Sequence, residues 1–179
     1  MKALLIIDVQ KGFLDENDYD PSYEVVDTVV KVANIFKKNN DKVIAFRHID
    51  DDPNSPIAPG TPNAEIPEAI LEFADEVIEK RYPISFKGTN LDEVLKENGI
   101  EEIYISGFNM EYCILFTSIA AADRGYDVTV IEDLCNTVNT GETYGMGNMN
   151  IIDFVGTVID RSGVIKNKYL EETEFNIKK

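Results

Sequence analysis

Short apolar runs alternate along the chain with segments whose apolar residues recur at helical spacing. The runs rich in β-branched residues predict strands at 3–9, 42–48, 75–81, 101–107 and 127–135, with a sixth at 157–165. The segments between them predict helices at 22–38, 64–73, 89–99, 110–125 and 143–155. This alternation predicts an α/β fold, in which helices cover both faces of a parallel sheet. We expect a single doubly wound domain over 1–179, with a mostly parallel sheet of five to six strands.

The charge balance narrows the possible partners. The chain has 17 Lys and Arg against 33 Asp and Glu, a formal net charge of −16. Such acidity argues against a nucleic acid or an anionic membrane as partner, because both require a basic surface. The first residues are too short an apolar run for a secretory signal, and two cysteines fit a reducing compartment. We therefore expect a cytoplasmic protein.

Chemically active residues stand where predicted strands end. Asp8 follows the first strand, His48 ends the second, Lys80 ends the third and Cys113 follows the fourth. Each has a simpler interpretation alone: a turn-capping aspartate, a surface histidine, a solvated lysine and a small core cysteine. Because ligands of such sheets bind beyond the carboxyl ends of the strands, the set predicts a single crevice.

The chemistry of this set is that of a cysteine hydrolase. A helix N-terminus and a nearby lysine favour thiolate over thiol, so both would act on Cys113. The Asp8 carboxylate can take the thiol proton and later return it to a leaving group. His48 is an alternative base for Cys113, as in a Cys–His dyad. The second cysteine, Cys135, is interpreted as structural.

Three segments resemble the isochorismatase-like cysteine hydrolases, a family that includes nicotinamidases, carbamoylsarcosine amidohydrolases and ureidoacrylate amidohydrolases. They are LLIIDVQKGF, KRYPISFKGTNL and ISGFNMEYCILFTSIAAADRGYDVTVIEDLC, in the family's order and spacing. The resemblance implies a catalytic triad with Asp8 as base, Cys113 as nucleophile and Lys80 as their electrostatic partner. It also implies a cis peptide between Phe108 and Asn109, an oxyanion hole formed by the N–H groups of Asn109 and Cys113, and a homodimer or homotetramer.

The chain departs from the family in two places. Met110 replaces the family's usual threonine, which removes a hydroxyl near the nucleophile. Nicotinamidases hold a divalent metal with one Asp and several His, whereas His48 is the only histidine here, so that set cannot be assembled. The carboxylates of Asp50, Asp51 and Asp52 offer oxygen ligands for a hard cation, but we favour the simpler interpretation of a solvated acidic loop. We expect neither a metal nor an organic cofactor.

The retained thiol favours cleavage of a C–N bond in a small amide or carbamoyl-type substrate, through a thioester on Cys113. The residues expected to border the substrate are Gln10, Phe13, Arg47, His48, Phe86 and Tyr112. Two other functions remain open. One is a non-catalytic small-ligand or thiol-reactive binding protein on the same fold. The other is an isochorismatase-type ether hydrolase, whose activity would survive loss of the thiol.

Overall fold

The computed structural model describes residues 1–15 and 21–175 and contains a central sheet whose neighbouring strands are all parallel. The strand order is β3-β2-β1-β4-β5-β6, so β1 lies centrally and the winding reverses there. The strands are β1 (Lys2–Ile7), β2 (Lys42–His48), β3 (Glu76–Lys80), β4 (Glu102–Gly107), β5 (Asp127–Cys135) and β6 (Lys166–Lys168). The expected doubly wound α/β fold is confirmed, and the sheet is entirely rather than mostly parallel.

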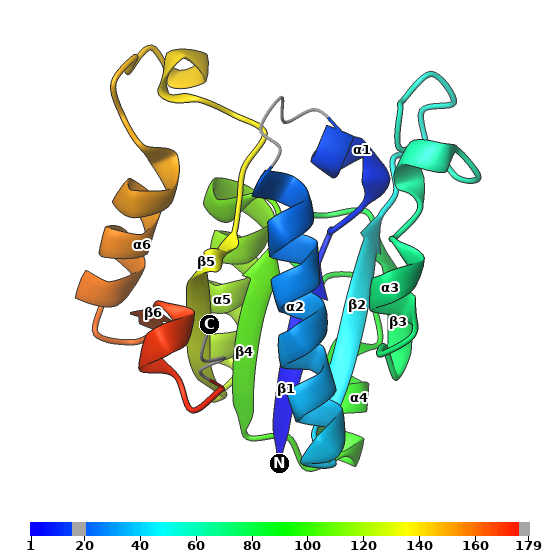
Figure 1. Cartoon of the computed structure of the whole chain (residues 1–179), viewed down its shortest axis with the longest axis vertical. Coiled ribbons are helices and arrows are strands. Elements are labelled where there is room, and N and C mark those ends of the chain that lie inside the picture. Colours follow the sequence, from blue (N-terminus) through cyan, green and yellow to red (C-terminus); the bar gives the residue numbers. More distant parts are fainter. Residues whose placement is uncertain (16–20, 176–179) are drawn as a thin grey trace.

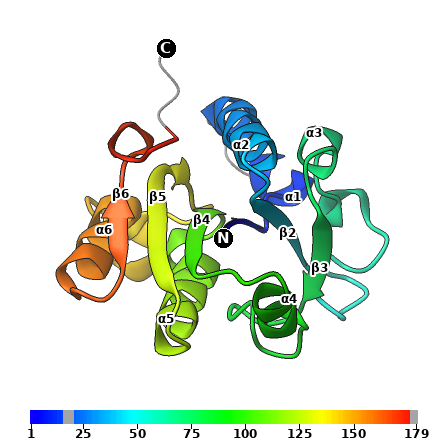
Figure 2. The same ribbon diagram turned by 90° about the horizontal axis from the view of Figure 1, so that it is seen from below.

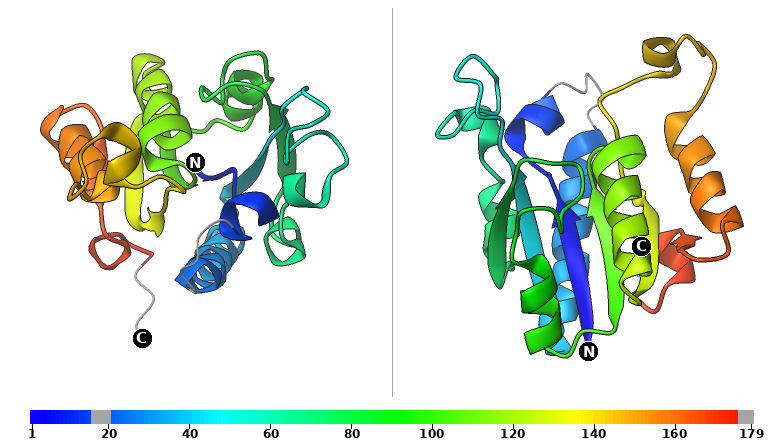
Figure 3. Two further views of the ribbon diagram at one scale, coloured as in Figure 1. Left: turned by 90° about the horizontal axis from the view of Figure 1, so that it is seen from above. Right: turned by 180° about the vertical axis from the view of Figure 1, so that it is seen from behind.

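Helices cover both faces of the sheet. One face carries α2 (Pro21–Lys38) and α3 (Glu68–Leu71), and the other carries α4 (Leu91–Glu97), α5 (Leu115–Asp123) and α6 (Ile151–Arg161) (Figure 1 and Figure 2). Shorter elements are α1 (Lys11–Asp15), the π-helical turn η2 (Met110–Ile114) and the 3₁₀ turns η1 (Pro62–Ala64), η3 (Gly141–Tyr144) and η4 (Leu170–Glu172). The turns α1 and η3 lie beyond the carboxyl ends of the strands (Figure 3). No described helix combines the length and the apolarity that crossing a bilayer requires.

The central strands are buried on both sides, which explains their unbroken apolar runs. In β1, Ala3, Leu5 and Ile7 pack into one core cluster, while Leu4 and Ile6 pack into the cluster on the opposite face. A strand covered on both faces has no polar side to alternate with its apolar one.

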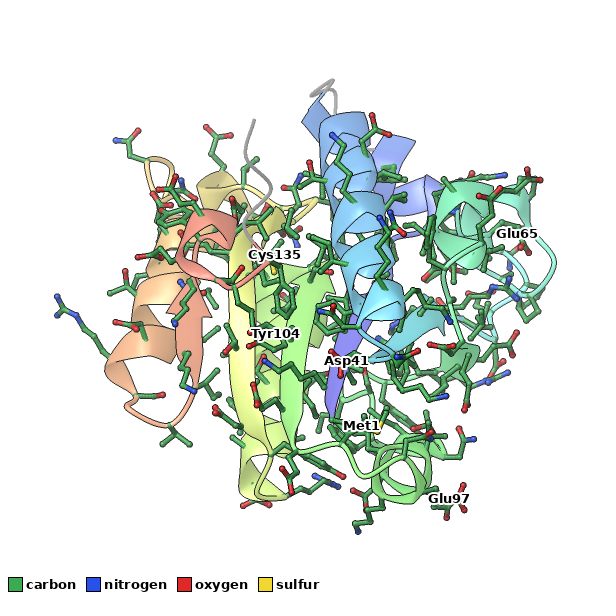
Figure 4. All side chains as sticks on the ribbon, turned by 60° about the horizontal axis from the view of Figure 1, so that its bottom comes forward. Met1, Asp41, Glu65, Glu97, Tyr104 and Cys135 are labelled. Carbon is green, nitrogen blue, oxygen red and sulfur yellow. The ribbon has the colours of Figure 1, made fainter. Side chains whose placement is uncertain are left out.

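At the amino-terminal end of the sheet, a hydrogen bond joins the start of β1 to the residue before β2. Asp41, just before β2, accepts a hydrogen bond from the Lys2 backbone N–H at 2.9 Å. Met1 and Asp41 lie near each other at this end (Figure 4).

The prediction of a sixth strand at 157–165 is wrong, because most of that segment belongs to α6 and β6 begins after it. Asn150 caps the start of the helix, and its side-chain oxygen accepts two backbone N–H groups of the first turn. Val155 and Ile159, four residues apart, are buried, while Phe154 and Val158 are exposed. This is helical spacing, and the β-branched residues concealed it. The helix predicted at 143–155 correspondingly begins at 151.

The helix predicted at 64–73 is also shorter than expected. Pro67 immediately precedes α3, which holds only four residues, and the preceding residues form the separate turn η1. A proline has no backbone N–H and restricts the residue before it, so a helix cannot continue smoothly through this position. The other predicted elements occur close to their expected bounds.

Candidate active site

Four adjacent strand ends bring the predicted residues together. Asp8 follows β1, His48 ends β2, Lys80 ends β3, and Cys113 lies in η2 just after β4. His48 and Lys80 are register partners across β2 and β3. Because these four strands are neighbours in a parallel sheet, their carboxyl ends form one edge.

The Lys80 ammonium lies at the centre of this group and is 1% exposed. Its Nζ donates to Asp8 Oδ2 at 2.6 Å, to Cys113 Sγ at 3.2 Å and to the Tyr82 carbonyl at 3.3 Å. His48 Nδ1 is a further neighbour at 3.1 Å. Lys80 therefore bridges the carboxylate and the sulfur.

Asp8 and Lys80 form a buried ion pair. Burial alone would raise the pKa of Asp8, but its neighbours, above all the charge of Lys80, outweigh it and hold that pKa below its usual value. Burial alone would lower the pKa of Lys80, but Asp8 and Cys113 outweigh it and raise that pKa. Each charge therefore keeps the other ionised, as a buried pair requires.

The Asp8 carboxylate has one free oxygen. Oδ2 is held by Lys80, whereas Oδ1 is buried and has no hydrogen-bond partner among the described residues. The Asp8 backbone has φ of +53°, in the left-handed region that residues other than glycine seldom adopt. Backbone strain of this kind clusters at functional sites, where surrounding structure enforces it. The free oxygen is available to accept a proton.

The surroundings of the Cys113 sulfur favour the thiol, whereas the helix entrance and the lysine predicted a thiolate. Burial, followed by the Asp8 carboxylate, raises the pKa of Cys113 from 9.0 to about 12, and Lys80 only partly opposes them. Burial likewise raises the pKa of Cys135. The sequence predicted that Lys80 would lie next to the Cys113 sulfur. Only the structure shows how deeply this sulfur is buried.

The turn before the nucleophile has a cis peptide between Phe108 and Asn109, which confirms that part of the resemblance. Gly107, which ends β4, has φ of +120°, and a Cβ there would lie 1.9 Å from the Ile7 carbonyl oxygen. The Phe108 N–H donates to that same oxygen at 2.8 Å, which ties the turn to β1. Within the described residues, the Asn109 N–H has no hydrogen-bond acceptor.

A sequence model of the isochorismatase domain matches residues 2–162. The chain belongs to the isochorismatase family. A relative, the uncharacterized isochorismatase family protein YrdC of Bacillus subtilis, is 32% identical over 134 residues, covering 74% of this chain and 72% of YrdC. Members of the family are hydrolases, and this chain is an isochorismatase-family hydrolase.

Solved structures of two amidases share the fold. N-carbamoylsarcosine amidase from Thermoplasma acidophilum superposes with a TM-score of 0.78 at 25% identity, covering 97% of this chain and 98% of the amidase. Nicotinamidase PncA from Bacillus subtilis gives a TM-score of 0.75 at 23% identity, with coverages of 93% and 98%.

The site also offers three metal-binding side chains, Asp8, His48 and Cys113, whose ligand atoms lie within 4.8 Å of one another. The Lys80 ammonium is within hydrogen-bond distance of one ligand atom of each of the three side chains. It therefore supplies the positive charge among them that a metal ion would otherwise supply. The Asp-plus-several-His set of nicotinamidases does not fit a chain with one histidine.

Gln10 holds the end of β2 in place. Its Oε1 accepts the His48 backbone N–H at 2.7 Å, and its Nε2 donates to the His48 carbonyl at 3.0 Å and the Ala64 carbonyl at 2.9 Å. Gln10 is fully buried, so it positions His48 rather than meeting solvent in a pocket.

The other predicted pocket residues have different surroundings. Arg47 pairs with Glu65 at 2.9 Å and with Glu79 at 3.4 Å, so its charge is already partnered; Glu65 lies beside the α3 segment (Figure 4). Phe13 stacks on Phe108 at 6.2 Å between ring centroids. Phe86 is buried in the core cluster that includes Cys113, facing Tyr126 and Arg124. Their roles at the substrate stay predictions.

Tyr112 is exposed beside the nucleophile and belongs to a network that the sequence did not reveal. Its hydroxyl contacts the Tyr144 hydroxyl at 2.9 Å. One oxygen of Glu111 accepts hydrogen bonds from Thr137 and Asn139 at 2.8 Å and from Tyr144 at 2.9 Å. Glu111 therefore fixes the loop after β5 against the turn that carries Cys113.

Thr117 was also missed. Its hydroxyl accepts the Ser85 backbone N–H at 3.0 Å and donates to the Pro83 carbonyl at 3.1 Å. These bonds tie the loop after Lys80 to α5. A threonine inside an apolar helix gives no signal of its partners in sequence, because they come from a segment far along the chain.

Proposed function

We propose that Asp8, Lys80 and Cys113 form a catalytic triad that hydrolyses a C–N bond of a small amide or carbamoyl-type molecule. The observation that carries this proposal is the Lys80 ammonium, which contacts the Asp8 carboxylate and the Cys113 sulfur inside the protein. Likeness to an N-carbamoylsarcosine amidase and a nicotinamidase supports the bond type.

In the first half of the reaction, the Cys113 sulfur attacks the carbonyl carbon while its proton passes to Asp8. The free oxygen Oδ1 supports this role, because it has no other hydrogen to accept. The N–H groups of Asn109 and Cys113 stabilise the oxyanion that develops. The C–N bond then breaks, Asp8 returns the proton to the departing nitrogen, and a thioester with Cys113 remains.

In the second half, Asp8 takes a proton from water, and the resulting hydroxide attacks the thioester carbon. The carboxylic acid product leaves, and the proton held by Asp8 returns to the sulfur. The overall change is the addition of one water across the C–N bond. Lys80 stays cationic throughout and balances whichever neighbour is negative.

The test is Cys113→Ala against a panel of small primary amides and N-carbamoyl compounds, with released ammonia or amine as the readout. We expect turnover to fall by a factor of about 10³ or more, as when a catalytic nucleophile is removed. Cys135→Ala is the matched control, since that thiol is also buried but lies outside the Lys80 contacts. Mass spectrometry of the wild type quenched in acid should show an acyl group on the Cys113 peptide.

Two outcomes would favour the other functions. Activity that survives Cys113→Ala on an enol-ether substrate would favour ether hydrolysis. Tight binding of a small ligand without turnover of any panel member would favour a binding protein. The predicted homo-oligomer and the predicted cytoplasmic location stay predictions.

A further inference from the structure

His48 is the only histidine of the chain, and it stands beside the triad without a place in the proposed reaction. Its Nδ1 lies 3.1 Å from Lys80 Nζ, 3.7 Å from Asp8 Oδ2 and 3.9 Å from Cys113 Sγ. The Gln10 amide holds both the N–H and the carbonyl of the His48 backbone, which fixes the residue from which the ring extends.

The neighbouring ammonium determines which ring nitrogen carries the hydrogen. An ammonium group has donors and no acceptor, and a neutral imidazole has one nitrogen of each kind. Lys80 is held in its charged form by Asp8. The Lys80 ammonium, 3.1 Å from Nδ1, is nearer than the Asp8 carboxylate, 3.7 Å from it, so the local field favours a lone pair on Nδ1 and the hydrogen on Nε2.

The Nε2–H group has no partner in the part of the chain that the structure describes. Nε2 makes no hydrogen bond within the described residues, and it is not among the buried unpaired polar atoms, so it meets solvent. His48 borders an open hollow of about 450 Å³. The remaining lining residues are Ile49, Asp50, Asp51, Ile57, Arg81 and Tyr82.

The charges of this hollow disfavour an anion. It has two carboxylates, Asp50 and Asp51, against one guanidinium. Arg81 Nε already donates to both oxygens of Asp51, at 3.0 and 2.8 Å. The Asp50 carboxylate remains as uncompensated negative charge, which would repel a carboxylate on the ligand.

We propose that His48 is a substrate-binding residue whose Nε2–H donates to a neutral acceptor, a carbonyl oxygen or an aromatic ring nitrogen, in the non-reacting part of the substrate. That the bound molecule is a substrate rests on the proposed function. The hydrogen on Nε2 and the binding of a neutral acceptor do not. The donor would orient the molecule so that its amide carbon faces the Cys113 sulfur. A molecule with a carboxylate at that position would bind less well than its neutral counterpart.

The first test reads the ring directly. With ¹⁵N-histidine labelling, the long-range ¹H–¹⁵N spectrum of the full chain contains a single imidazole, because His48 is the only histidine. We expect Nδ1 to resonate as an unprotonated acceptor and Nε2 as a protonated nitrogen. A hydrogen on Nδ1, or an averaged mixture of the two tautomers, would overturn the proposal. In Lys80→Met the constraint is gone, and the two nitrogens should move toward averaged positions.

The second test measures binding to Cys113→Ala, which cannot consume the ligand. Three amides of equal length are compared: succinamide with a neutral second carbonyl, succinamate with a carboxylate, and 4-methylpentanamide with neither. Succinamide should shift the Nε2 resonance and bind about tenfold more tightly than 4-methylpentanamide, the effect of one neutral hydrogen bond. Succinamate should bind more weakly than succinamide.

Two variants separate the hydrogen bond from packing. His48→Gln retains an N–H at a comparable position and should keep part of the preference for succinamide, whereas His48→Leu should abolish it. Equal affinities for the three amides, tighter binding of succinamate, or no shift with any of them would contradict the proposal. If the Nε2 shift is seen but the wild type hydrolyses no amide, the proposed function fails while the binding role stands.

Discussion

Replacing Asp8 by asparagine separates two ways in which a carboxylate can activate a thiol. If Asp8 removed the proton in the resting protein, its loss would make Cys113 less reactive. The structure predicts the opposite, because burial and then the Asp8 charge raise the pKa of Cys113 to about 12. In Asp8→Asn the negative charge is gone, and Lys80, 3.2 Å from the sulfur, is the charged neighbour that remains. Thiolate should therefore become more abundant.

The size of the effect follows from the usual influence of one adjacent charge, about one to three pKa units. At a pH below both pKa values, this raises the thiolate fraction roughly 10- to 1000-fold. A thiolate of lower pKa is also a weaker nucleophile, and a Brønsted coefficient of about 0.5 halves the exponent. We expect Cys113 alkylation to be about 3- to 30-fold faster in Asp8→Asn.

The assay is alkylation by iodoacetamide over a series of pH values, quantified by mass spectrometry of the peptides. Cys135, in the core on β5, is an internal reference in every sample. Lys80→Met is the matched control of opposite sign, because it removes the cation and leaves Asp8, so alkylation should slow. Each variant leaves a buried charge unpaired and should lose about 3–5 kcal/mol of stability. Rates are therefore compared at a temperature where circular dichroism shows all proteins folded.

Slower alkylation in Asp8→Asn than in the wild type would refute this reasoning. It would mean that Asp8 generates a resting thiolate, as the sequence alone had suggested. The expected combination is faster alkylation together with loss of amide turnover. That pair of results identifies a base that acts during attack on the carbonyl rather than before it.

Three further predictions concern the scaffold of the site. Gly107→Ala should lower the free energy of unfolding by at least about 3 kcal/mol, since its Cβ would lie 1.9 Å from Ile7 O. Gly125→Ala is the control, because nothing lies within 4 Å of its added Cβ, and its free energy of unfolding should fall by only about 1 kcal/mol. Equal losses for the two variants in urea unfolding would contradict this. Asp75 is partly buried, yet a lysine and a backbone N–H lower its pKa, so it contributes its full stability above its unfolded pKa of about 4. That contribution is lost as the pH falls through the lower folded pKa, so Asp75→Asn should unfold less steeply in acid; parallel acid unfolding curves would rule this out. Glu111→Gln should make hydrogen exchange of the backbone amides in the loop after β5 about tenfold faster. An unchanged exchange rate would show that the three hydrogen bonds of Glu111 do not fix the loop.

The sequence predicts the central strands well because their middle residues are buried on both faces. The segments 42–48 and 127–135 coincide with β2 and β5, and each contains a buried run, 43–46 and 128–132, that consists largely of apolar residues. The error at 157–165 arose where Val158 and Ile159 are adjacent but face opposite environments, one exposed and one buried. The β-branched residues of this segment indicate a strand. The helix becomes evident only when it is known which of them are buried against the rest of the protein.

The residues of the site could be predicted to meet, but their chemical state could not. Asp8 and Lys80 stand at strand ends, and the topology of a parallel sheet is sufficient to bring such ends together. The protonation of Cys113 depends on burial, which the sequence does not state. The supports from Gln10 and Glu111 depend on partners far away in the chain, so neither residue type nor spacing could indicate them.

The total charge of the site explains why the proton should stay on sulfur until a substrate arrives. At rest, one carboxylate and one ammonium surround a neutral thiol, so the buried group has no net charge. A resting thiolate would place two anions around a single cation in a space from which water is largely excluded, at a high desolvation cost. In the proposed reaction, the proton reaches Asp8 only as the sulfur bonds to carbon, and the negative charge then appears on the carbonyl oxygen. In this proposal the oxygen meets the Asn109 N–H, which has no acceptor among the described residues, so each charge that forms would have a partner already in place.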